Sequence, residues 1–202
     1  MPAIQSMWLS AAALILFTIS SPTRLNATPT GPFFNPATGH NYYLLDNSNW
    51  TDAQAQALTL GGNLVTVNDA AENAWLISEF SDYNGVARNL WIGLNAIGLD
   101  GGNASNYSWV SGETAAYRNW ASGEPNFSDQ RVYIIGSVGS PAFGKWDNTS
   151  DALTTGYNQF PQLPNYGVAE VVPEPASYLL VLFGGLLFCR CRSRRSATRN
   201  QI

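Results

Sequence analysis

Two stretches in the middle of the chain combine polar capping residues with apolar positions at helical spacing. Thr51-Asp-Ala-Gln54 is typical of a capping box that opens a helix, and Gly61-Gly62 ends that helix. Asp69-Ala-Ala-Glu72 is a second capping box and predicts a helix that runs to about Phe80. The apolar residues of both segments recur on one face, so we expect each helix to pack against a core.

The other apolar clusters of the central region are short, and loops rich in glycine, asparagine and serine separate them. This pattern predicts strands. The predicted strands are His40–Asp46, Asn63–Val67, Leu90–Leu94, Tyr107–Val110, Val132–Ile135, Lys145–Trp146 and Tyr166–Val171. Because the two helices come first and several antiparallel strands follow, the order indicates an α+β fold rather than a parallel α/β sheet.

The N-terminal apolar run, Met7–Ile19, carries no charge. It fits the apolar core of a signal peptide and is too short to span a membrane, which takes about 20 residues. Cleavage is expected after Ser20 or Ala27. We therefore expect residues 1–27 to be a signal peptide, residues 28–38 to be a linker rich in proline, and residues 39–171 to form one domain.

A second apolar run, Ala176–Cys189, follows Val172-Pro173-Glu174-Pro175 and precedes a cluster of arginines. As a helix it would reach roughly 21 Å, against a hydrocarbon core of about 30 Å. The positive-inside rule keeps the arginines in the cytoplasm and the domain outside. Because the apolar run is short, we expect residues 172–202 to insert into the membrane temporarily rather than to form a permanent anchor.

This order of motif, short apolar helix and arginine cluster resembles the PEP-CTERM sorting signal of Gram-negative bacteria, over roughly Val172 to Arg195. The resemblance implies transient anchoring in the inner membrane and cleavage by an exosortase near Pro173, Glu174 and Pro175. It also implies a periplasmic, outer-surface or matrix location in a bacterium that makes exopolysaccharide and biofilm. A retained membrane tail is the alternative.

The charge of the domain and the positions of its cysteine and histidine residues exclude several classes of function. Residues 31–172 hold four basic and thirteen acidic side chains, a net charge of −9 that disfavours nucleic acid and suits cations or neutral ligands. Both cysteines, Cys189 and Cys191, lie in the tail, so the domain has no disulfide. His40 is the only histidine, which excludes a zinc cluster of histidines and a histidine-based triad. We do not expect an enzyme.

Several blocks together resemble a C-type lectin-like domain over about Gly39 to Val171. They are two helices around Gly-Gly-Asn-Leu-Val, then Leu90-Trp-Ile-Gly-Leu94, Tyr107-Ser-Trp-Val110, Asn119-Trp120 and Glu124-Pro125-Asn126. The resemblance implies that fold, with short antiparallel strands and a long loop region. The cysteines of the family are missing, and Arg131 stands where one is usual.

A candidate calcium site lies in this loop region. Calcium takes six to eight oxygen ligands, with carboxylates to offset its charge. Glu124, Asn126 and Asp129 offer two carboxylates and one carboxamide. The resemblance implies a cis peptide before Pro125 and a second half-site of Trp-Asn-Asp. Here the order is reversed, because Asp147 and Asn148 follow the tryptophan, and neighbouring strand residues face opposite sides.

The predicted metal ligands are Glu124, Asn126, Asp129, Asp147 and Asn148, with Asp151 as a substitute. The resemblance implies that the same loop also binds vicinal hydroxyls of mannose- or glucose-like sugars through Glu124, Asn126, Asp147 and Asn148. The leading hypothesis is therefore a calcium-assisted carbohydrate-binding protein whose partner is an exopolysaccharide or another glycan. The alternative is a structural or adhesive matrix protein that uses the fold without sugar or calcium.

Overall fold

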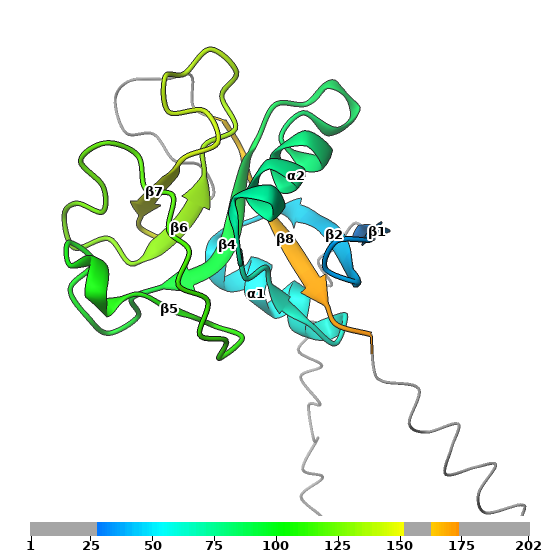
Figure 1. The fold of residues 1–202 in the computed structure, drawn as a ribbon, viewed down its shortest axis with the longest axis horizontal. Helices are drawn as coiled ribbons and strands as arrows, with labels where there is room; N and C mark the ends of the chain where they lie inside the picture. The colour runs from blue at the N-terminus through cyan, green and yellow to red at the C-terminus, as the bar shows by residue number, and fades with distance from the viewer. Residues whose placement is uncertain (1–27, 152–162, 174–202) are drawn as a thin grey trace, which may run out of the picture.

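The computed structural model describes residues 28–151 and 163–173, which form two α-helices and a mixed sheet (Figure 1). The helices are α1 (Trp50–Thr59) and α2 (Ala70–Phe80). The strands are β1 (Thr30–Asn35), β2 (His40–Asn47), β3 (Asn63–Leu64), β4 (Asn89–Asn95), β5 (Ser108–Trp109), β6 (Arg131–Ile134), β7 (Trp146–Thr149) and β8 (Asn165–Val171). Two short 3-10 turns are η1 (Tyr83–Gly85) and η2 (Ala104–Asn106).

The sheet has the order β1-β2-β8-β4-β6-β7, with β3 added beside β8 and β5 beside β4. Every pair is antiparallel except β4 and β8, which run parallel. Strand β8, from the end of the domain, therefore lies between β2 and β4 and brings the two ends of the domain together (Figure 1). The α+β class is confirmed, and the one parallel pair is what the sequence pattern did not predict.

Each helix begins at an asparagine or aspartate cap. The Asp69 side chain accepts a hydrogen bond from the backbone N–H of Glu72 at 2.8 Å, which confirms the predicted cap, whereas the Glu72 side chain accepts from the backbone N–H of Asn68 at 2.8 Å and not from that of Asp69. Helix α1 begins earlier than predicted, because Asn49 Oδ1 accepts from Asp52 N at 2.7 Å. Thr51 lies inside the first turn, and its backbone N–H and hydroxyl donate to the carboxylate of Asp151.

Part of the predicted linker belongs to the sheet. Residues 30–35 form the edge strand β1, paired with β2. Proline is tolerated at such an edge because its missing N–H faces away from the ladder. The Phe33 ring packs edge-on against Phe80 and Tyr83, with centroid distances of 5.1 and 5.5 Å. The apolar contact explains why a segment with turn-forming residues is ordered here.

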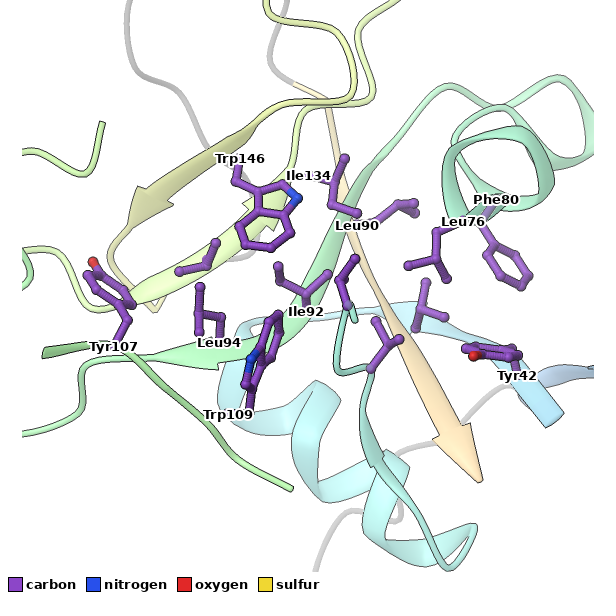
Figure 2. Packing of buried hydrophobic residues seen from close by; sticks show 14 of the residues in the cluster. Tyr42, Leu76, Phe80, Leu90, Ile92, Leu94, Tyr107, Trp109, Ile134 and Trp146 are labelled. Atoms are coloured by element: carbon purple, nitrogen blue, oxygen red, sulfur yellow. The ribbon is translucent and has the colours of Figure 1, made fainter. Parts of the chain in front are cut away.

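The core extends beneath the loop-rich part of the sheet, where long loops gather around β5, β6 and β7 (Figure 1). Trp146, at the start of β7, is fully buried and its indole N–H donates to Asn73 of α2 at 2.7 Å. The rings of Trp109 and Tyr117 meet it edge-on at 5.9 and 5.5 Å. Figure 2 shows Trp146 beside Ile134 and Ile92 in this packing. A buried anchor therefore fixes the residues that follow it in β7.

The terminal predictions fall largely outside the described residues. The signal peptide and most of the sorting segment, including Glu174 and Pro175, are not among residues 28–151 and 163–173, whereas Pro173 is the last described residue. Within these ranges no helix combines the length and the hydropathy that crossing a membrane requires.

Candidate functional site

The candidate site lies where a long loop meets β7. The loop begins at Trp120, which forms an isolated bridge with Trp146, and the backbone N–H of Ala121 donates to the carbonyl of Trp146 at 2.8 Å. The same chain then passes through the Glu124 motif and enters β6, which pairs with β7. Both ends of the loop are thus tied to one short strand, and its middle is held over that strand.

Glu124 and Asn126 are brought together at the turn of this loop. The peptide bond between Glu124 and Pro125 is cis, as the resemblance implied. The side-chain amide of Asn126 donates to Glu124 Oε1 at 2.6 Å. A carboxylate and a carboxamide two residues apart therefore form one polar unit.

Asn148 holds the backbone of the loop. It is 5% exposed, and its Oδ1 accepts from the backbone N–H of Asn126 at 2.9 Å. Its Nδ2 donates to the carbonyls of Asn126 and Asp129 at 2.7 and 2.9 Å. An amide matches a peptide group because it carries a donor and an acceptor, whereas an ionised aspartate would present only acceptors to these two carbonyls. The side chain of Asn148, which was predicted to be a calcium ligand, is thus hydrogen-bonded to the backbone of the loop.

Asp147 lies on the opposite side of the strand from Asn148, as alternation along a strand requires. It is paired in register with Tyr133 of β6, and the Tyr133 hydroxyl donates to Asp147 Oδ2 at 2.7 Å. Burial raises the pKa of the Asp147 carboxyl above its ordinary value. Because the order of the dipeptide is reversed, Asp147 carries the carboxyl group of the site and Asn148 makes the hydrogen bonds to the loop.

Glu124 is the most perturbed carboxyl group of the site. Burial, and then the nearby charge of Asp147, raise its pKa to about 7. Its Oε2 atom is buried and has no hydrogen-bond partner among the described residues when both carboxyl groups are ionised, whereas a protonated Glu124 forms a side-chain hydrogen bond with Asp147. A buried, unpaired carboxylate oxygen beside a second carboxylate is unfavourable unless a cation or a proton compensates it. Either a proton shared by Glu124 and Asp147 or a bound cation can therefore compensate the pair.

Asp129 flanks the pair. Its charge acts on Asp147, and burial raises the pKa of its own carboxyl. Its backbone carbonyl accepts from the hydroxyl of Tyr107 at 2.8 Å as well as from Asn148. The chain of Gly101 passes so close that a Cβ there would stand 1.6 Å from the Asp129 carbonyl oxygen. Only glycine allows this approach.

Asp151 lies apart from this group. Its two carboxylate oxygens accept from the backbone N–H and the hydroxyl of Thr51, at 3.1 and 2.5 Å. The substitute ligand considered from the sequence therefore secures the first turn of α1 instead. Sequence reasoning missed Tyr133 and Tyr107, because their roles depend on strand pairing and loop packing that no local pattern encodes.

The donor set fits a calcium ion with open coordination positions. Glu124 and Asp147 would supply two carboxylates, which match the charge of Ca²⁺, and Asn126 would supply an amide oxygen. Among the described residues no cluster of three or more His, Cys, Asp or Glu side chains is arranged to hold a metal ion. The protein side chains alone are thus too few for six to eight ligands, and hydroxyl oxygens of a ligand or water would complete the shell.

Comparison with known proteins decides the family. The sequence model of the lectin C-type domain matches residues 46–157, more than half of the chain. The chain belongs to the C-type lectin family. This C-type lectin domain resembles rat (Rattus norvegicus) lithostathine, with 33% identity over 113 residues that cover 55% of the chain and 66% of lithostathine. It also resembles a C-type lectin mannose-binding isoform of Oxyuranus scutellatus, with 30% identity, covering 56% and 72% of the two chains.

Solved structures show the same fold. The carbohydrate-recognition domain of cow CD23 gives a TM-score of 0.50 at 23% identity and covers 67% of this chain and 90% of that one. The lectin CEL-I of Cucumaria echinata gives 0.51 at 22% identity, covering 66% and 91%. A calcium-independent type II antifreeze protein gives 0.52 at 19% identity, covering 74% and 97%. The chain spans 66%, 53% and 65% of the first three curated relatives.

The raised pKa of Glu124 predicts how the calcium-free lectin domain responds to pH. The folded protein keeps this proton up to about pH 7, whereas the ordinary value is 4.5. The folded state binds more protons in that window, so the free energy of unfolding should fall as pH rises from 4.5 to about 7. Chemical denaturation at several pH values in EDTA measures this slope.

The variant Glu124→Gln should show a shallower slope in the same window, because its amide does not titrate. Asp147 contributes a slope of the same sign in both proteins, since its pKa is raised as well. Equal slopes for the wild type and Glu124→Gln would contradict the assigned environment of Glu124.

The clamp by Asn148 predicts the effect of adding a carboxylate there. Asn148→Asp removes the two N–H donors that reach Asn126 and Asp129, and should lower the free energy of unfolding by about 2–4 kcal/mol. The control is Asn103→Asp, because Asn103 Oδ1 only accepts, from the backbone N–H and hydroxyl of Ser105. Urea denaturation compares them. An equally small loss in both variants would show that the clamp is unimportant.

Proposed function

We propose that this domain binds a neutral glycan with the help of one calcium ion held by Glu124, Asn126 and Asp147. The observation that carries the proposal is the partly buried pair of carboxyl groups, in which Glu124 Oε2 lacks a hydrogen-bond donor among the described residues once both groups are ionised. A divalent cation would relieve both the repulsion and the missing contact. Asp129 adds negative charge from the side, and Asn148 acts as a positioning residue because it fixes the Asn126 backbone.

The polar unit of Glu124 and Asn126 suits a pair of neighbouring hydroxyl groups. The carboxylate accepts a hydrogen bond and the amide of Asn126 donates one, so each can engage one hydroxyl. When bound, calcium would supply direct contacts to the oxygens of that pair. Two similar proteins support this class of ligand: the mannose-binding isoform of Oxyuranus scutellatus, and cow CD23, whose structure was obtained in the presence of a GlcNAc2Man3 oligosaccharide.

The charge of the domain supports a neutral ligand. With a net charge of −9 over residues 31–172, the domain would repel nucleic acid and acidic polymers, whereas a neutral exopolysaccharide carries no such penalty. A structural or adhesive role without calcium is the competing function. A calcium-independent type II antifreeze protein that is 19% identical to this chain has the same fold, so the fold by itself does not imply calcium binding.

Binding without catalysis is the role that we propose. The only histidine, His40, contacts the buried Glu170 at 2.6 Å in the sheet of β2 and β8, on strands other than those of the candidate site. The site itself pairs carboxyl groups with amides, a set that suits cation and hydroxyl binding.

Export is the second part of the proposal. The run Met7–Ile19 would direct secretion, and the segment from Val172 to Arg195 would be recognised and cleaved by an exosortase near Pro173-Glu174-Pro175. The mature domain would then act at the outer surface or in the exopolysaccharide matrix of a Gram-negative bacterium. Its lack of cysteines suits either compartment, because no disulfide has to form.

Calcium should stabilise the purified domain. With the dissociation constants of about 10⁻⁴–10⁻³ M that are typical of extracellular modules, about 10 mM calcium should add about 1.4–2.7 kcal/mol to the free energy of unfolding. Thermal melting in calcium and in EDTA measures the change. Glu124→Gln should abolish the shift, whereas Glu113→Gln, a change of the same kind at an exposed glutamate, should preserve it.

A glycan array in calcium and in EDTA then tests the sugar. We expect neutral glycans with vicinal hydroxyls to bind only in calcium. A melting temperature that calcium does not move, together with an empty array, would favour the structural or adhesive role.

The sorting signal should be needed for release. In a host that carries an exosortase, we expect the wild-type chain to lose its tail and to leave the inner membrane. Replacing Pro173-Glu174-Pro175 by alanines should leave the uncleaved chain in the membrane fraction, as measured by immunoblotting of cell fractions. Equal release of both chains would refute the exosortase step without affecting the binding proposal.

A further inference from the structure

An arginine stands at the point where the site loop ends. Arg131 is the first residue of β6 and directly follows the loop that carries Glu124 and Asn126. It is paired in register with Asn95 of β4 on one side and with Thr149 of β7 on the other. A displacement of Arg131 would therefore move the end of the loop and change its pairing with both neighbouring strands.

The Arg131 side chain lies over an aromatic ring of helix α1. Its guanidinium carbon is 4.9 Å from the centre of the Trp50 ring. Trp50 is the first residue of α1, is 3% exposed, and donates its indole N–H to the carbonyl of Ile92 at 2.8 Å. A cation over the face of a tryptophan ring is attracted to it, and more strongly where water is excluded. The fixed ring therefore gives the loop end a defined contact on α1.

The guanidinium group is partly enclosed by protein. Its Nε and Nη1 atoms are buried and have no hydrogen-bond acceptor among the described residues. Burial lowers the pKa of Arg131, and the negative charge of Asp151 acts against this effect. Buried donors without acceptors are costly, so stability alone would favour an apolar side chain in contact with the same ring. The arginine therefore calls for a further explanation.

Asp151 connects the other side of the site to the same turn of α1. It lies just beyond β7, and its carboxylate accepts hydrogen bonds from the backbone N–H and the hydroxyl of Thr51. Thr51 is the neighbour of Trp50, the residue that Arg131 contacts. The residue that ends the loop and the residue that follows β7 thus both contact the first turn of α1.

The face of the sheet that carries Arg131 also leads to the carboxyl pair. Side chains at alternate positions of a strand share a face, so Tyr133 lies on the same face as Arg131. The Tyr133 hydroxyl donates to Asp147 Oδ2 at 2.7 Å, and Asp147 lies within electrostatic range of Glu124. The position of Arg131 on α1 therefore affects where β6 presents the partner of Asp147.

We propose that Arg131 is a positioning residue of the candidate site, and that its contact with Trp50 holds the loop end and the start of β6 in the arrangement that binds calcium. Without this contact the loop should sample other arrangements, in which Glu124, Asn126 and Asp147 are not brought together. The apparent dissociation constant then rises, because only a fraction of the molecules can bind. This inference rests on the proposed function and adds a residue outside the ligand set on which that function depends.

Calorimetric titration of the purified protein with calcium tests this role. Arg131→Gln removes the cation, and its dissociation constant for calcium should be about tenfold higher than that of the wild type, the factor that a cation–π contact of intermediate strength supplies. Arg131→Lys keeps a cation over the ring and should stay within about threefold of the wild type. The matched control is Arg88→Gln, because Arg88 lies over the Tyr166 ring at 4.6 Å in the segment before β4. This control should not change the dissociation constant.

Amide hydrogen exchange in EDTA separates positioning from a general loss of stability and needs no calcium. The backbone N–H of Asn126 donates to Asn148 Oδ1, so its exchange reports on opening of the loop. In Arg131→Gln this amide should exchange about tenfold faster than in the wild type, and the amides of α2 should be accelerated by a smaller factor. An equal factor in both segments would show a purely structural role and overturn the inference.

The two measurements distinguish a failure of this inference from a failure of the proposed function. Arg131 does not position the site if Arg131→Gln binds calcium as tightly as the wild type, if Arg131→Lys is as weak as Arg131→Gln, or if Arg88→Gln weakens binding equally; the proposed function then stands. If the wild type binds no calcium, the proposed function fails, and the exchange of the Asn126 amide still decides whether Arg131 holds the loop.

Discussion

The candidate site depends on two carboxyl groups that the fold holds near each other in partly buried positions. Burial, and then the charge of Asp147, raise the pKa of Glu124, and one oxygen of Glu124 has no hydrogen-bond donor within the described residues when both groups are ionised. Without a compensating charge this arrangement opposes folding, because like charges repel and a buried oxygen has lost its water. The rest of the loop region can be understood as the means of holding this unfavourable pair in place.

Rigid packing beneath the pair maintains it. Trp146 is fully buried and bonded to α2, so the residue after it, Asp147, has a fixed position. Asn148 then binds the loop that carries Glu124, through three hydrogen bonds to the backbone of Asn126 and Asp129. Two adjacent residues of β7 thus have different roles: Asp147 carries a carboxyl group of the site, and Asn148 aligns the loop. The reversed dipeptide is consistent with this division, because the amide makes contacts that a carboxylate could not make.

Much of the fold could be predicted from local patterns. The capping aspartate Asp69 and the strand Leu90–Leu94 are encoded by neighbouring residues, and both are confirmed. The parallel pairing of β4 with β8 could not be predicted, because it joins segments that lie far apart in the chain. Strand β1 was missed since its turn-forming residues suggested a linker, and its order depends on distant contacts of Phe33.

The candidate site, too, could be predicted only in part from the sequence. Glu124 and Asn126 could be identified from their motif, and the structure brings them into contact. The separate roles of Asp147 and Asn148 depend on which face of the sheet each side chain points to, because Asp147 shares its face with its partner Tyr133 of β6, whereas Asn148 lies on the face that contacts the loop. Strand alternation predicts that two neighbours diverge, but it does not say which of them meets which partner.

If a cation compensates Glu124 and Asp147, a crystal structure grown in calcium, with anomalous scattering data, will locate it. We expect one anomalous peak within about 2.3–2.6 Å of carboxylate oxygens of both Glu124 and Asp147, with the side chain of Asn148 still bound to the loop backbone. Density without a peak at this position, or an ion bound by Asn148 in place of Asp147, would contradict it.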